Sequence, residues 1–289
     1  MSVLSLHTVL RRAAAAVLLL AAVALPAWAE TAPNPLSIAG PQGLALQVHW
    51  YPLKDARGPQ PVVIAFHGCA GLYRSDSVTF DERYPDYIKY LHERGYAVLL
   101  PDSFTSRGSG SICEIAARDR TINVETRRED VISAIAWLKS RSDVDGKRIA
   151  LLGWSHGAMT VLSALNTQRE PHAQGIAGAA VFYPGCSELL RRGYGLQVPL
   201  LMQLGALDDW TAPAPCEKLV AQLTAQPGSD VTLRIYPDSY HGFDSRTPAR
   251  FRMGVPNGTN PGGVHVGGNR KARAQSLDEL DRFLKRILQ

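Results

Sequence analysis

The stretch "RIALLGWSHGAMTVLSAL", residues 148–165, places a serine between two glycines where one apolar pattern gives way to another. After Arg148, residues 149–153 form a continuous run without polar side chains, which predicts a strand buried on both faces. The residues after the serine have apolar spacing typical of a helix. Gly153 and Gly157 leave room for a sharp turn around Ser155, which predicts a hydroxyl exposed above a sheet edge. The alternative interpretation is a serine that caps the following helix.

Strands and helices alternate along the rest of the chain. Further strands are predicted at 44–51, 61–68, 96–102, 178–185, 199–209 and 231–238. Further helices are predicted at 78–94, 124–141, 215–225 and 273–288, while 156–166 forms the helix after the serine. This alternation predicts an α/β fold with a mostly parallel central sheet and helices on both faces. Functional groups are then expected at the carboxyl ends of the strands.

The N-terminus has the features of a targeting segment. It contains a basic pair at 11–12, an apolar run and the small-residue pattern A-W-A at 27–29. The run is shorter than the roughly 20 residues that span a bilayer, so we expect a secretory signal peptide over 1–29. An uncleaved anchor is the alternative. Residues 30–289 are then predicted to form one α/β domain in the periplasm or outside the cell.

Composition excludes several classes of partner. The net charge of +5 is modest, and the basic residues are not clustered, so no nucleic-acid partner is expected. No later apolar run is long enough for membrane insertion after the signal is removed. No C-x-x-C pair or Cys/His cluster has zinc spacing, so neither a metal nor another cofactor is predicted. The oligomeric state has no signature in the sequence.

Four cysteines in an exported chain predict two disulfides. We pair Cys69 with Cys113, because they follow two neighbouring predicted strands. Cys186 and Cys216 likewise come from adjacent strand ends, so we pair them with each other. Four free thiols are the alternative.

A serine hydroxyl is a weak nucleophile unless a base and an orienting carboxylate act on it. For a serine on a strand-to-helix turn, the expected chain order is serine, acid, histidine. His241, just after the last predicted strand, is the expected base. Asp208 is the expected acid, and the adjacent Asp209 is the alternative, otherwise expected to cap the segment before the next helix. Ser155, Asp208 and His241 are therefore the predicted catalytic residues.

An acyl-transfer site also needs N–H donors for the oxyanion of a tetrahedral intermediate. One donor is expected from the residue after the nucleophile, His156. The second is expected from the loop "AFHGCAGL", where Gly68 and Gly71 let the backbone curl around the N–H of Cys69. The backbones of Cys69 and His156 are therefore the predicted oxyanion hole.

Several residues near these positions have two interpretations. The aromatic residues beside the catalytic positions either line a pocket or pack around strand ends: Trp154, Tyr183, Trp210 and Phe243. Arg107 either meets an acidic substrate or lies on the surface. The segment 254–269, rich in Gly, Pro and Asn, is expected to be a mobile loop, either a flap over the site or a surface excursion.

Together these segments resemble the dienelactone hydrolase family of the α/β-hydrolase superfamily. The matching segments run in family order over roughly the whole of 30–289: "VVIAFHGCAGL", "GYAVLLPDSF", "DVDGKRIALLGWSHGA", "VFYPG", "PLLMQLGALDDWTAP" and "LRIYPDSYHGFD". The resemblance implies the α/β-hydrolase fold. It also assigns the triad to Ser155, Asp208 and His241, and the oxyanion hole to the backbones of Cys69 and His156.

The sequence departs from the enzymes that give the family its name. They use a cysteine nucleophile where this chain has Ser155, they have a glutamate at the position of Gly68, and they lack an export signal. These differences argue against the dienelactone substrate. The predicted function is an exported serine hydrolase of carboxylic esters or lactones, with a small molecule as its substrate. The alternatives are a peptidase or acylaminopeptidase of the same fold, and a non-catalytic envelope binding protein.

Overall fold

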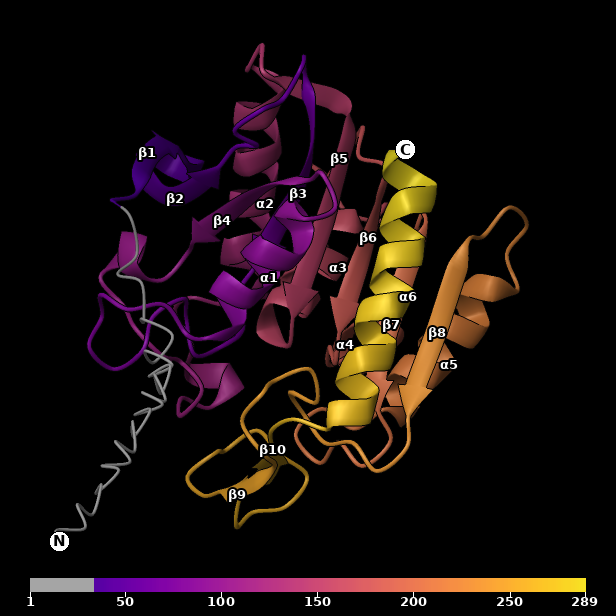
Figure 1. Cartoon of the computed structure of the whole chain (residues 1–289). Coiled ribbons are helices and arrows are strands. Elements are labelled where there is room, and N and C mark those ends of the chain that lie inside the picture. The colour runs from indigo at the N-terminus through magenta and orange to yellow at the C-terminus, as the bar shows by residue number, and fades with distance from the viewer. Residues whose placement is uncertain (1–33) are drawn as a thin grey trace, which may run out of the picture.

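The structure, a computed structural model, describes residues 34–289, which form a large sheet flanked by helices and a small sheet beside it (Figure 1). The large sheet contains β1 Leu36–Ala39, β2 Ala45–Tyr51, β3 Gln60–Phe66, β4 Ala97–Asp102, β5 Val144–Trp154, β6 Gly178–Phe182, β7 Leu200–Gly205 and β8 Val231–Tyr236. The small sheet pairs β9 Arg250–Arg252 with β10 Val264–Val266.

The strand order of the large sheet is β1-β2-β4-β3-β5-β6-β7-β8. β2 pairs antiparallel with both β1 and β4, and each other neighbouring pair is parallel. The carboxyl ends of β3 through β8 therefore meet at one edge, where the loops after parallel strands converge. The predicted mostly parallel α/β fold is confirmed.

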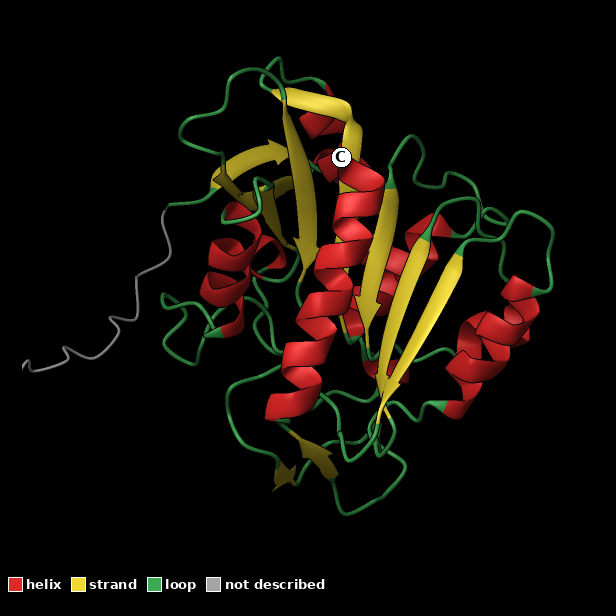
Figure 2. Cartoon of the chain, turned by 45° about the vertical axis from the view of Figure 1, so that its right-hand side comes forward, coloured by secondary structure: helices red, strands yellow, loops and turns green. Residues whose placement is uncertain are grey.

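Helices cover both faces of this sheet, as Figure 2 shows for α6, which lies across one face. They are α1 Arg83–His92, α2 Val124–Lys139, α3 His156–Leu165, α4 Ser187–Arg192, α5 Ala214–Thr224 and α6 Arg270–Leu288. Ile64 of β3 packs in the core that α2, α3 and α5 share, and its neighbour Val63 packs in the core under α1 and α6. Because both faces are buried, the central strands are apolar at successive positions.

Several predicted elements end earlier than their apolar pattern. The strands expected at 61–68, 178–185 and 199–209 stop at Phe66, Phe182 and Gly205. The residues directly after Phe66 and Phe182 are buried and those after Gly205 are exposed, but all of them form the turns of the carboxyl edge. The helix expected at 78–94 begins only at Arg83. Four elements were not predicted, and each is short: β1, α4, β9 and β10.

The predicted signal peptide, residues 1–29, lies outside the described residues. Within 34–289, the structure has no helix that combines the length and the apolar character needed to cross a membrane.

Candidate active site

Ser155 occupies a strained turn between β5 and α3. Its backbone has φ 53° and ψ −116°, in a region that non-glycine residues rarely adopt. The flanking glycines make the turn possible. A Cβ on Gly153 would lie 2.6 Å from the carbonyl oxygen of Gly157, and one on Gly157 would lie 2.1 Å from that of Phe66. Only glycine fits at these two positions, so this turn requires the G-x-S-x-G pattern.

The structure brings Ser155, His241 and Asp208 into one hydrogen-bonded chain. Nε2 of His241 lies 2.9 Å from Oγ of Ser155, and its Nδ1 lies 2.8 Å from Oδ2 of Asp208. A carboxylate only accepts hydrogen bonds, so Nδ1 carries the proton and Nε2 is free to accept from the serine hydroxyl. His241 and Asp208 are both buried, at 3% and 4% exposure. The arrangement has the geometry needed to draw a proton from Ser155.

Asp208 is held by the loop that follows β7. Its Oδ1 accepts hydrogen bonds from the backbone N–H of Trp210 at 2.9 Å and of Thr211 at 2.8 Å. The expected capping role of Asp209 was wrong, because Asp208 takes these N–H groups. Asp209 instead accepts from both the backbone N–H and Nδ1 of His265, each at 2.8 Å. The two adjacent aspartates therefore point to different histidines, and only Asp208 contacts His241.

The ring of His241 rests on an aromatic residue that is itself anchored. The centroids of the Tyr183 and His241 rings lie 4.5 Å apart. The Tyr183 hydroxyl donates to Oδ1 of Asp244 at 2.6 Å, and burial raises its pKa well above the ordinary value, so it keeps its proton. Asp244 also accepts from the hydroxyl of Tyr87 at 2.9 Å and pairs with Arg83. This buried network fixes the plane against which His241 packs.

The two predicted oxyanion donors lie on segments that meet at Ser155. A Cβ on Gly68 would lie 3.6 Å from Cβ of Ser155, so the loop carrying Cys69 passes directly beside the serine. Within 34–289, no hydrogen bond joins the backbone N–H of Cys69 or His156 to a protein acceptor. Both N–H groups are therefore available to a ligand.

Arg127 of α2, which the sequence analysis missed, forms a hydrogen bond with each of these two segments. It is fully buried, and its Nη2 donates to the carbonyl oxygen of His67 at 2.8 Å while its Nη1 lies 2.9 Å from Nδ1 of His156. Burial and the charge of Arg127 lower the pKa of His156 well below the ordinary value. His156 is therefore neutral, and its Nδ1 accepts from Arg127. Burial also lowers the pKa of Arg127 to about 10, against an opposing effect of Asp130.

Two disulfides lie at the carboxyl edge, in the pairs expected from the sequence. They are Cys69–Cys113 and Cys186–Cys216. The first holds the loop of the Cys69 N–H, and Ile112 adds a backbone hydrogen bond to the carbonyl oxygen of Cys69 at 2.8 Å. The two bridges span 44 and 30 residues, and in the chain-entropy account each stabilises the folded state by roughly 3 to 4 kcal/mol.

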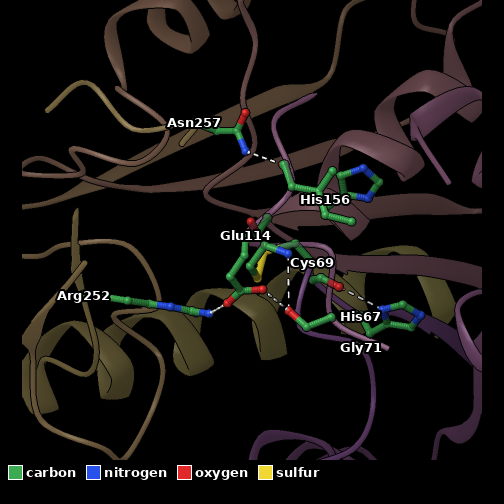
Figure 3. The surroundings of a disulfide bond; sticks show 12 residues. His67, Cys69, Gly71, Glu114, His156, Arg252 and Asn257 are labelled. Carbon is green, nitrogen blue, oxygen red and sulfur yellow. Dashed lines mark hydrogen bonds and ion pairs between the residues drawn. A yellow bond between two sulfur atoms is a disulfide. The ribbon is translucent and has the colours of Figure 1, made fainter. Parts of the chain in front are cut away.

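Figure 3 shows a second set of contacts around the Cys69–Cys113 disulfide. Arg252 of β9 points toward Glu114 and forms an ion pair with it. Asn257 donates to the carbonyl oxygen of Ile115 at 3.0 Å and accepts from the backbone N–H of Ala117 at 2.8 Å. β9 and the segment after it are therefore bound to the residues that directly follow Cys113.

Residues 254–269 border the site and are more structured than expected. β10 falls within them, and the backbone N–H of Thr259 donates to the carbonyl oxygen of Asp209 at 2.8 Å. The N–H of Gly267 donates to the carbonyl oxygen of His241 at 2.9 Å. This segment is thus tied to both loops that carry the residues around Ser155.

A cavity of about 400 Å³ opens over Ser155. Of the four aromatic residues considered for its wall, Trp210 alone lines it. The assignment of Trp154, Tyr183 and Phe243 to a pocket was wrong, since they are at most 1% exposed and belong to the core under α1 and α6. Trp154 follows Leu152 by two residues on β5, so it faces that same core. Residues that the sequence analysis missed also line the cavity, among them Arg120, Met159, Glu188 and Asn257.

Arg107 does not reach the cavity. Its guanidinium forms two hydrogen bonds with the buried carboxylate of Asp130, at 2.8 and 3.0 Å, and a third with the carbonyl oxygen of Ser103. Neither expected role is observed, because Arg107 is a partly buried partner of α2. Among the described residues no group of three or more histidine, cysteine or acidic side chains is placed to hold a metal ion.

The chain is 24% identical over 222 residues to dipeptidyl aminopeptidase BIII of Pseudoxanthomonas mexicana, a match that covers 65% of this chain and 31% of that protein. The chain thus spans about a third of that relative's length.

Solved structures share the fold. A dienelactone hydrolase-like promiscuous phosphotriesterase from metagenomic libraries superimposes with a TM-score of 0.63 and 15% identity, covering 89% of this chain and 98% of that one. A butyrate-bound thermophilic esterase from Thermogutta terrifontis gives 0.59 and 16%, covering 90% and 95%. Residues 48–288 match the profile of the dienelactone hydrolase family. That match covers most of the chain, which therefore belongs to the dienelactone hydrolase family.

Proposed function

We propose that this protein is a serine hydrolase that cleaves carboxylic esters or lactones through an acyl-enzyme on Ser155. The observation that carries the proposal is the hydrogen-bonded chain from Ser155 through His241 to Asp208, opening into a cavity. Family membership supports hydrolysis as the reaction class. The choice of an ester or lactone comes from the serine at the nucleophile position and from a cavity of small-molecule size.

In the proposed reaction, Oγ of Ser155 attacks the substrate carbonyl carbon while Nε2 of His241 takes the hydroxyl proton. Asp208 accepts from Nδ1 and stabilises the imidazolium that forms. The carbonyl oxygen becomes an oxyanion, to which the N–H groups of Cys69 and His156 donate. The intermediate collapses, the alcohol leaves with the proton from His241, and an acyl ester remains on Ser155. Water then attacks the acyl carbon and gives a proton to His241, which passes it to Oγ of Ser155 as the acyl bond to the serine breaks and the acid leaves.

A fluorophosphonate probe tests this proposal, since it reacts only with an activated serine. The wild type should be labelled on Ser155 and hydrolyse p-nitrophenyl acetate, and Ser155→Ala should do neither. An unlabelled, inactive wild type would favour the non-catalytic binding protein instead.

Peptidase activity is a second candidate, because one relative is a dipeptidyl aminopeptidase. An aminoacyl p-nitroanilide assayed beside the acetate ester distinguishes the two. We expect the ester to be the better substrate by at least a hundredfold in kcat/KM, and the reverse preference would make peptide hydrolysis the activity.

We also propose that the chain is exported to the periplasm or beyond. The two disulfides support this proposal, because they persist in oxidising compartments. Mass spectrometry of protein from a native-type host should give a mature N-terminus at Glu30, whereas an intact Met1 would contradict cleavage.

A further inference from the structure

A second cavity, of about 700 Å³, lies beside the one that opens over Ser155. Its size falls within the range of about 300–1,000 Å³ typical of small-molecule sites. The two cavities share four lining residues: Ala117, Met159, Gly185 and Glu188. None of the roles proposed so far uses this second cavity.

The second cavity follows helix α3 away from Ser155. Met159 and Ser163 line it from one face of the helix, four residues apart, and Asn166, which caps the end of α3, continues the line. Ser155 precedes Met159 by four residues, so this stripe starts at the serine. At a rise of 1.5 Å per residue, the stripe from Met159 to Asn166 is about 10 Å long.

Gly185 lies at the junction of the two cavities. A Cβ there would be 3.5 Å from Sδ of Met159 and 3.6 Å from Cγ2 of Thr211, which is ordinary contact distance. A glycine therefore leaves space between Met159 and Thr211 that any larger residue would fill. An unbranched chain fits such a space better than a branched or cyclic group.

The remaining wall suits an apolar ligand. Val124, the first residue of α2, and Leu189 of α4 contribute apolar side chains. Four charged residues at the wall form two ion pairs, Glu125 with Arg169 and Glu188 with Arg192, and these side chains are 38% to 59% exposed. The fifth, Arg118, pairs with Asp119 and has a side chain that is 87% exposed. Their charges are thus satisfied near the solvent, and no charge inside the cavity calls for a charged ligand.

The position of His241 determines whether the acyl group or the alcohol group of an ester would enter the second cavity. In the proposed reaction the leaving alcohol takes its proton from Nε2 of His241. Trp210, whose ring centroid lies 4.8 Å from that of His241, lines the first cavity but not the second. The alcohol therefore leaves on the Trp210 side, and the acyl group extends along α3.

We propose that the second cavity binds the acyl group, so that the preferred substrates are esters of unbranched, apolar carboxylic acids longer than butyrate. This proposal rests on ester hydrolysis at Ser155. Each methylene buried in an apolar cavity contributes a factor of about four to binding. A blocked cavity should therefore reduce selectivity for long chains by tenfold or more.

The test compares kcat/KM for p-nitrophenyl acetate, butyrate and octanoate. The wild type should prefer octanoate to acetate, and Val124→Trp should lower the octanoate-to-acetate ratio at least tenfold. Leu189→Trp, on α4, serves as an independent block in case the first variant does not fold. The matched control is Val78→Trp, at a position 57% exposed and outside both cavities, which should keep the wild-type ratio.

A binding measurement separates failure of this proposal from failure of the proposed function. Octanoate binding to Ser155→Ala, measured by calorimetry, should weaken at least tenfold when Val124→Trp is added. If esters are hydrolysed but neither blocked variant changes the ratio, the acyl cavity is refuted and ester hydrolysis stands. If no ester is hydrolysed, the proposed function fails, and absence of the Val124→Trp effect on octanoate binding then refutes the cavity as well.

Discussion

Replacing Arg127 with methionine should impair turnover far more than folding. Arg127 donates to the carbonyl oxygen of His67 and to Nδ1 of His156, one partner on each segment that carries a proposed oxyanion donor. Without it, the loop before Cys69 and the start of α3 lose their common anchor. Since the oxyanion forms only during the reaction, the loss should affect kcat and leave KM nearly unchanged.

The two effects can be estimated separately. Two buried acceptors left without donors cost about 1–3 kcal/mol each. Against this, burial lowers the pKa of Arg127 to about 10, so removing the charge relieves a desolvation cost on the order of 3 kcal/mol. The net stability loss should therefore stay below about 3 kcal/mol. A weakened oxyanion donor typically costs about 3 kcal/mol of barrier, or roughly a hundredfold in kcat.

The assay is steady-state hydrolysis of p-nitrophenyl acetate, with thermal unfolding and the affinity for a trifluoromethyl ketone inhibitor measured alongside. The inhibitor forms an oxyanion on the serine, so its affinity should fall in step with kcat. Arg128→Met is the matched control: Arg128 is the next residue of α2, is also buried, and donates to backbone carbonyls at Arg169 and Pro171, away from Ser155. A folded Arg127→Met variant with wild-type kcat would refute the reasoning.

Three other outcomes are expected. Ser155→Ala and His241→Ala should each lower kcat by several orders of magnitude, and the double variant should be barely worse, because such residues act as a unit; additive losses in ester kinetics would contradict this. Asp208→Asn should be severely impaired and Asp209→Asn mildly so, since only Asp208 contacts His241; the reverse order would make Asp209 the acid. Replacing 254–269 with a short Gly/Ser linker should change selectivity between small and bulky esters, and identical kinetics would reject a flap.

The central fold could be predicted because its strands are buried on both faces. The continuous apolar run of β5 and the helical spacing of α3 are local patterns, and G-x-S-x-G fixes the turn between them. The short elements were missed because such patterns need a longer stretch of sequence. A strand of three or four residues, such as β9 or β1, has too few positions to establish a period.

Some residues of the site could likewise be predicted from the sequence, and others could not. The order of Ser155, Asp208 and His241 along the chain follows from strand ends, so sequence could place them together. Trp154 and Phe243 lie within two residues of Ser155 and His241 in sequence, but their side chains face the core under α1 and α6, and closeness in sequence alone does not reveal a direction. Arg127 did leave a signal: with Val131, Ala134 and Leu138 it falls on the buried stripe of α2. A charged residue on an apolar stripe indicates a buried partner for its charge.

The disulfide at Cys69 has a practical consequence for inhibitor profiling. Cys69 lines the cavity over Ser155, and its sulfur is occupied only while the bridge to Cys113 is intact. Protein prepared under reducing conditions would present a thiol at the cavity wall. Iodoacetamide could then block substrate access without touching the nucleophile, and the inhibition would mimic that of a cysteine hydrolase. Inhibition by a thiol reagent therefore indicates that the disulfide is reduced in the preparation. Only in an oxidised sample does such a reagent test whether the nucleophile is a cysteine or a serine.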